Sequence, residues 1–146
     1  MAIGSTMEGQ ILSLLLAGKP ITNFATTSGS TVVWCALHTS DPTSGTGQNQ
    51  GEVSFTGYTR VSVDRSTAAA IGWTISGSGP ATASPLGTIT FPQLTSTSTG
   101  TVTYWSVGQS SATAGQIIAS GTVTPNLNMG QNVTMQITTG SSITLS

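Results

Sequence analysis

The stretch "TVVWCALHTSDP", residues 31–42, contains the only histidine and the only cysteine of the chain, and one of its three tryptophans. Its first eight residues form an apolar run that ends at His38, a pattern typical of a β-strand buried on both faces. The Asp41-Pro42 pair indicates a turn, because an aspartate side chain accepts hydrogen bonds from the amides that follow it and proline fixes φ. The stretch therefore predicts a buried strand that ends in a tight corner.

The composition around this strand is that of an all-β protein with very few charges. The sequence has 146 residues, of which 5% are charged and 18 are glycine, and its formal net charge is -1. Its many β-branched residues suit pleated, half-buried strands, whereas disordered chains usually combine high charge with few such residues. We predict one domain over 1–146, an antiparallel β-sandwich or jelly-roll-like barrel whose β-domain covers 31–146.

Short strand-like segments separated by turn signals follow the first strand. Segment 57–63 alternates, with Tyr58 and Arg60 on one face and two valines on the other, and segment 132–138 alternates most clearly. The remaining predicted strands are 70–75, 86–91, 101–108, 117–123 and 142–146. Segments rich in Gly, Pro and Ser are predicted loops at 39–52 and 76–85, with the greatest mobility expected at 43–52 and 76–100.

Residues 5–18 are the one predicted helix. Ser5 and Glu8 have the spacing of a capping box, and Gly18 followed by Pro20 is typical of a helix end. The apolar surface is broad and needs a partner, either the protein's own sheet or another subunit. The interface residues that we predict on it are Met7, Ile11, Leu12, Leu15 and Leu16. Loop 43–52 is the second segment expected to contact a neighbour.

The sequence offers no convincing catalytic or metal site, and we expect no cofactor. His38, Ser40 and Asp41 lie close together, but a Ser-His-Asp triad is usually assembled from distant parts of a chain. Along a strand, the Cys35 and His38 side chains point to opposite faces, which disfavours a shared metal ion. Cys35 is expected to be a buried, inert thiol.

A structural interpretation explains the same residues better. His38 can donate to a nearby carbonyl or to Asp41 and so close the corner. Arg60 can reach a carboxylate such as Glu52 or Asp64, either as a local structural pair or as an interface contact. The residues assigned to this predicted turn motif are His38, Asp41, Pro42, Tyr58 and Arg60.

Charge also excludes classes of partner. Three basic residues cannot form a patch for the phosphates that dominate nucleic-acid affinity, and they cannot support a basic membrane-binding helix. The start of the sequence lacks the basic segment of a signal peptide, so we expect synthesis in a cytosol. No nucleic-acid or membrane partner is predicted.

The run from 34 to 63 resembles a family of small bacteriophage virion proteins. Members show a strand ending in L-H-T-x-D-P, a Gly-rich loop and an E-V-x-x-x-G-Y-x-R segment. The matching positions are Leu37, His38, Thr39, Asp41, Pro42, Glu52, Val53, Gly57, Tyr58 and Arg60. Segments 100–124 and 126–146 are similar to the later parts of the family, in which an N-terminal helix is also found.

The resemblance implies a structural virion protein made in a bacterial host. Such proteins are labelled capsid decoration (cement) proteins in some phages and tail-fibre-like proteins in others. A decoration protein would bind the major capsid protein on the outside of the head and associate with itself as a trimer or dimer. The alternative is a tail-fibre or tail-tip module that contacts host glycan through an exposed aromatic cleft near Tyr58 or Trp73.

Overall fold

The computed structural model describes residues 2–3, 32–45, 47–65, 70–76 and 81–145. Every strand pair in this part of the chain is antiparallel, which confirms the all-β prediction. The predicted helix over 5–18 lies outside the described residues, as do its interface residues. These residues are Met7, Ile11, Leu12, Leu15 and Leu16.

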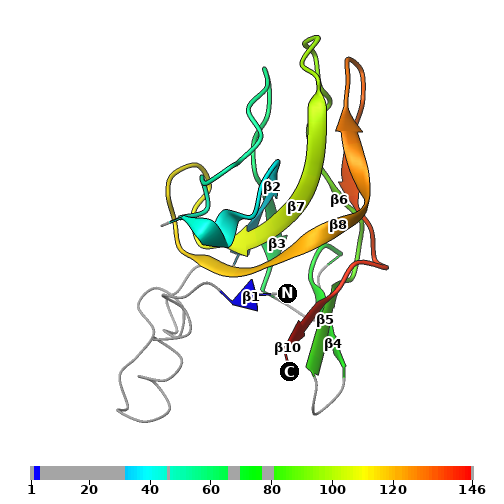
Figure 1. The fold of residues 1–146 in the computed structure, drawn as a ribbon. Coiled ribbons are helices and arrows are strands. Elements are labelled where there is room, and N and C mark those ends of the chain that lie inside the picture. The colour runs from blue at the N-terminus through cyan, green and yellow to red at the C-terminus, as the bar shows by residue number, and fades with distance from the viewer. Residues whose placement is uncertain (1, 4–31, 46, 66–69, 77–80, 146) are drawn as a thin grey trace.

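The largest sheet has five strands in the order β1-β8-β7-β2-β3 (Figure 1). Its strands are β1 (Ala2–Ile3), β8 (Ile117–Met129), β7 (Gly100–Gly108), β2 (Val32–His38) and β3 (Val61–Asp64). The apolar run predicted as a buried strand is β2, which lies between β7 and β3. Val33, Cys35 and Leu37 alternate along it and enter the hydrophobic core.

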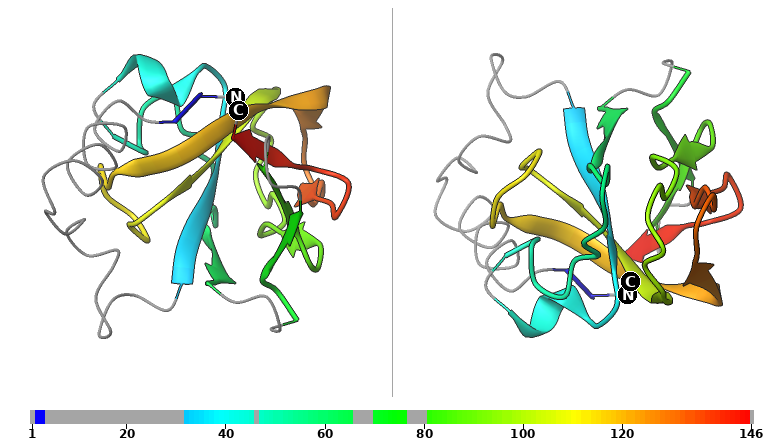
Figure 2. Two further views of the ribbon diagram at one scale, coloured as in Figure 1. Left: turned by 90° about the horizontal axis from the view of Figure 1, so that it is seen from below. Right: turned by 90° about the horizontal axis from the view of Figure 1, so that it is seen from above.

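A short two-stranded sheet packs on that apolar face and makes the fold sandwich-like (Figure 2). Its strands are β6 (Ile89–Thr90) and β9 (Gln136–Ile137). The chain around them supplies Phe91, Leu94 and Met135 to the same core, each almost completely buried. The core therefore lies between the five-stranded sheet and the segments around β6 and β9.

A third sheet has the order β10-β5-β4. Its strands are β10 (Ile143–Leu145), β5 (Ala81–Pro85) and β4 (Trp73–Ser76). The prediction of a loop over 76–85 is wrong for its second half, because residues 81–85 form the central strand of this sheet. Small apolar and hydroxyl residues alternate in "ATASP", and this pattern is obscured in sequence by the Gly, Ser and Pro content around it.

Turns shorten the predicted strands over 57–63 and 132–138. In the first, the Tyr58 amide donates to the Phe55 carbonyl in a turn that contains Gly57, whose φ is 88°. Strand β3 therefore begins only at Val61. Asn132 has a φ of 64° and lies in a turn, so the strand predicted over 132–138 begins only at Gln136, in β9. Alternation in sequence does not reveal residues that adopt the left-handed conformation.

Strand β8 is longer than predicted, and it continues through Pro125. The β7–β8 register is irregular between Val102 and Tyr104, and Pro125 falls in the corresponding part of β8. Proline is tolerated at such irregularities because it cannot donate a ladder hydrogen bond.

Candidate functional site

A buried polar cluster lies on the face of the five-stranded sheet opposite the core. Strand alternation directs Cys35 and Leu37 into the core and His38 to the other face. The β2–β7 register places Ser106 opposite Ala36, on the same face as His38. The loop after β2 brings Gln48 over them, and the side chains of His38, Ser106 and Gln48 are all 0% exposed.

The hydrogen bonds of this cluster fix the state of His38. Its Nδ1 lies 2.9 Å from the carbonyl oxygen of Gln50, which can only accept, so Nδ1 carries the proton. Nε2 then accepts from the Ser106 hydroxyl at 2.7 Å. The Ser106 oxygen in turn accepts from Gln48 Nε2 at 3.3 Å. Burial lowers the pKa of His38 below its ordinary value, in agreement with this neutral imidazole.

Arg60 extends the cluster to the charged pair of the site. Its Nη1 donates to Gln48 Oε1 at 3.1 Å and to the Ser110 carbonyl at 2.7 Å. Its Nε and Nη2 donate to the two carboxylate oxygens of Glu52 at 2.8 and 2.7 Å. The Arg60 side chain is 1% exposed and that of Glu52 is 14% exposed, so this bidentate pair is largely removed from water.

Tyr58 connects the ion pair to the central strand. Its hydroxyl accepts from the Leu37 amide at 3.0 Å and donates to Glu52 Oε1 at 3.1 Å. Burial raises the pKa of this phenol above its ordinary value. The ring packs edge-on against Phe55, with centroids 5.1 Å apart. Of the two carboxylates considered for Arg60, the structure places Glu52 beside it.

Asp41 and Pro42 form the corner, and the Asp41 carboxylate bonds to Thr43 rather than to the imidazole. Asp41 is the N-cap of the short 3-10 helix η1 (Pro42–Ser44), and its Oδ1 accepts from the Thr43 amide at 2.9 Å. Of the two partners considered for His38, a backbone carbonyl and Asp41, the structure places a carbonyl on its ring. The predicted turn motif is thus divided into a capped corner and a separate buried cluster.

Gln48 and Ser106 are central to the cluster, and the sequence interpretation missed both. Gln48 lies in the loop expected to be mobile and to contact a neighbour, yet it is completely buried. The backbone amide of Gln48 donates to the Gly115 carbonyl at 2.9 Å. Its side chain lies so close to Gly108 that a Cβ on Gly108 would overlap the Gln48 side chain. A glycine opposite a long polar side chain is a signal of close packing, but sequence alone does not pair these positions.

The cluster has one feature of a hydrolytic site and lacks the others. Ser106 and His38 have the spacing of a nucleophile and its base. However, a carbonyl rather than a carboxylate orients the imidazole, and both side chains are closed to solvent. Within the described ranges, no group of three or more His, Cys, Asp or Glu side chains is arranged to hold a metal ion. Burial raises the pKa of the Cys35 thiol to about 12.

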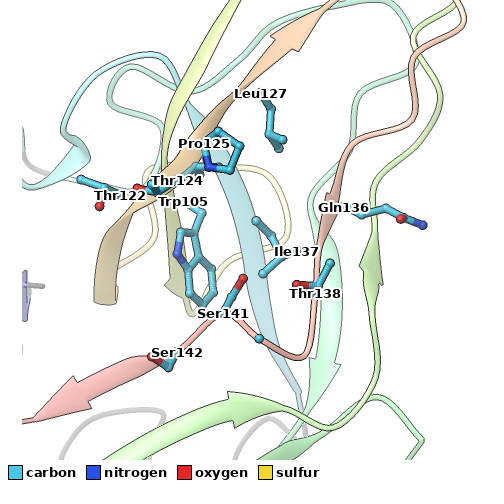
Figure 3. A pocket seen from close by; sticks show the side chains of 12 residues that line it. Trp105, Thr122, Thr124, Pro125, Leu127, Gln136, Ile137, Thr138, Ser141 and Ser142 are labelled. Carbon is cyan, nitrogen blue, oxygen red and sulfur yellow. The ribbon is translucent and has the colours of Figure 1, made fainter.

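A hollow of about 510 Å³ lies on the other side of the molecule, between β8 and the chain around β9 (Figure 3). Its apolar wall is formed by Trp105, Val123, Pro125, Leu127 and Ile137, and hydroxyl groups lie around it. The polar lining residues are Thr122, Thr124, Gln136, Thr138, Ser141 and Ser142. None of the lining residues is ionisable, so this hollow suits a neutral, hydroxyl-rich ligand or chain segment.

A second hollow of about 380 Å³ lies beside the ion pair and is lined by Tyr58, Phe55 and Arg60. It lies near one of the two aromatic residues that the glycan alternative names. Trp73, the other, is half-buried and packs against the core cluster. The Tyr58 ring also stacks on Phe91, at a centroid distance of 6.3 Å.

When the sequence is compared with models of known protein families, one family matches nearly its whole length. The model of the family described as podophage GP4 fiber I protein gp80 matches residues 2–145. None of the curated proteins matches the sequence. Among the described residues, no helix has the length and apolar character needed to cross a membrane.

Proposed function

The chain belongs to the family of the podophage GP4 fiber I protein gp80, and on this premise we propose that it is a structural component of a bacteriophage fibre. The observation that carries the proposal is the extent of the match, because residues 2–145 include all ten described strands. The resemblance to phage virion proteins is confirmed at the level of this structural family.

The polar cluster supports a structural role. Its hydrogen bonds connect β2, β7 and the loop over 39–52, and they leave no open face on Ser106 or His38 for a substrate. Such a satisfied buried network fixes one arrangement of loop and sheet. In a fibre, this cluster would hold the surface loop in a constant shape from one copy to the next.

Decoration of the outside of the head is the second candidate, with the major capsid protein as the partner. It is supported by the sequence, which contains no internal repeat of the kind that forms a long shaft. Its near-neutral composition also suits attachment through many weak contacts, which sum when many copies bind one lattice.

Labelled virions separate these two candidates. Antibody raised against the purified chain, followed by electron microscopy of intact particles, should label discrete projections if the chain is a fibre component. Uniform labelling of the head surface would support decoration instead. If purified virions contain no copy of the chain by mass spectrometry, both proposals are wrong.

A fibre module can also contact host glycan, and the hollow beside Trp105 is the surface that supports this activity. Its apolar wall with neutral hydroxyl groups around it matches the chemistry of an uncharged sugar. Screening the purified chain on a glycan array tests the idea, with Ser141→Ala, beside the Trp105 ring, as the variant and Ser62→Ala, exposed and outside the hollow, as the control. Equal glycan binding by both variants would contradict it.

A further inference from the structure

The three-stranded sheet has one apolar face and one hydroxyl face. Cross-strand partners share a face, so Trp73 and Pro85 lie on one side together with Ile75 and Ala83. Between them in sequence are hydroxyl residues that occupy the opposite face. These are Thr74, Ser76, Thr82 and Ser84. Ile75 is 59% exposed, more than the other large exposed hydrophobic residues of the described chain.

The outer edge of β4 faces no other strand of the described residues. β4 is the last strand of the order β10-β5-β4, and in the described part of the chain no strand lies beyond it (Figure 1). The Leu86 amide donates to the Gly72 carbonyl at 2.9 Å, which sets the alternation of hydrogen-bonded pairs along β4 and β5. Thr74 and Ser76 therefore bond to β5, and the backbone groups of Trp73 and Ile75 point outward.

Natural proteins usually protect an open edge with charged residues, proline or a bulge. Strand β4, "WTIS", has none of these features, and its register with β5 is regular over all four residues. Strands β5 and β10 also contain no ionisable residue. The edge thus combines unused backbone donors and acceptors with an exposed apolar side chain.

We propose that β4 pairs in an antiparallel manner with β4 of a second copy of this chain. In this arrangement a two-fold axis passes beside Thr74, and Trp73 of each copy lies opposite Ile75 of the other. The outward backbone groups of Trp73 and Ile75 are then satisfied, and the two sheets join into one of six strands. The pairing is independent of where a fibre attaches, so its failure would leave the proposed function intact.

A second copy suits this edge because the residues of β4 complement one another across a two-fold axis beside Thr74. The two-fold operation brings an aromatic residue beside a β-branched one twice, a favourable cross-strand pair, and Thr74 beside its own copy. Since the strand is neutral, self-pairing brings no like charges together. The contact is short and would be weak alone, but it gains strength when copies are held together in a virion.

A cysteine cross-link tests the register. In the proposed pairing Thr74 faces Thr74 as a non-hydrogen-bonded pair, whose Cα separation of about 4.5 Å permits a disulfide. Thr74→Cys should therefore form a covalent dimer with oxidised glutathione as the oxidant. Ser76→Cys, which is also exposed but lies two residues from the axis, should form far less. The native Cys35 is completely buried and does not compete. Equal cross-linking of both variants, or of neither, would overturn the proposal.

Self-association without a cross-link provides the second measurement. Sedimentation equilibrium of the full chain should show a monomer–dimer equilibrium. Ile75→Asp should raise its Kd by at least about tenfold, because it introduces like charges and removes the apolar contact. Val133→Asp, a matched change at another exposed β-branched residue outside this sheet, should leave Kd unchanged. A chain that stays monomeric, or a Kd that Val133→Asp alters equally, would contradict β4 pairing.

Discussion

The cluster around Arg60 and the sheet formed by β10, β5 and β4 use polar groups in opposite ways. In the cluster, the side chains of Arg60, Gln48, Ser106 and His38 are buried and hydrogen-bonded to one another. In the sheet, the hydroxyls lie on one face and an apolar face remains exposed at Ile75. The cluster thus completes its interactions within one copy, whereas the described part of the chain offers the outer edge of β4 no strand to pair with.

The largest effect expected from this difference is the loss of stability when Arg60 is replaced. Arg60→Met would leave the Glu52 carboxylate without its cation and the Gln48 and Ser110 oxygens without a donor. Removing one partner of a buried ion pair costs about 3 kcal/mol or more. We therefore expect the free energy of unfolding, measured by urea denaturation, to fall by about that amount.

The double variant Arg60→Met with Glu52→Gln provides the control for charge. It removes the uncompensated carboxylate, so it should be more stable than Arg60→Met alone. If Arg60→Met costs under about 1 kcal/mol, the pair behaves like a solvent-exposed salt bridge and the contrast between the two regions is wrong.

The same serine-to-alanine change in each region gives the next prediction. Ser106→Ala removes the donor to His38 Nε2 in a completely buried site and should cost about 2 kcal/mol. Ser84→Ala, on the hydroxyl face of β5, removes no hydrogen bond and should stay within about 0.5 kcal/mol of the parent. Thermal and urea denaturation of the two variants make the comparison. Equal costs would show that burial of the hydroxyl does not distinguish the regions.

The sequence predicted the parts of this fold that depend on local pattern. The apolar run of β2 indicated a buried strand, and the strand predicted over 86–91 contains β6. The Asp41-Pro42 turn also followed from local chemistry. By contrast, β5 was hidden because its small residues resemble a loop until β4 and β10 flank it.

The cluster was only half predictable for a similar reason. Arg60 and Glu52 attract attention in a chain with few charges, and either a local or an interface role was open for Arg60. Gln48 and Ser106 are ordinary in a sequence rich in uncharged polar residues. They become distinctive only because the strand register and the loop bring them together over a distance of 58 residues in sequence.

The smallest expected effect comes from pH, because it removes no atoms. Burial lowers the pKa of folded His38 below the ordinary value of 6.5, against the raising effects of the Gln50 carbonyl, Glu52 and Asp41. Below pH 6.5 the unfolded chain therefore binds a proton that the folded chain resists. The stability contributed by neutral His38 is complete above the unfolded pKa and is lost as pH falls through the folded pKa.

The measurement is the free energy of unfolding against pH, for the parent and for His38→Gln. Because His38 is the only histidine in the sequence, the variant should lose the part of the slope that begins just below pH 6.5. All other groups are common to both proteins, so the difference between them isolates His38. A slope unchanged by His38→Gln would mean that the imidazole is protonated equally in the folded and unfolded chain. Burial would then not disfavour the protonated imidazole in solution, contrary to the complete burial of His38 beside Ser106 and Gln48.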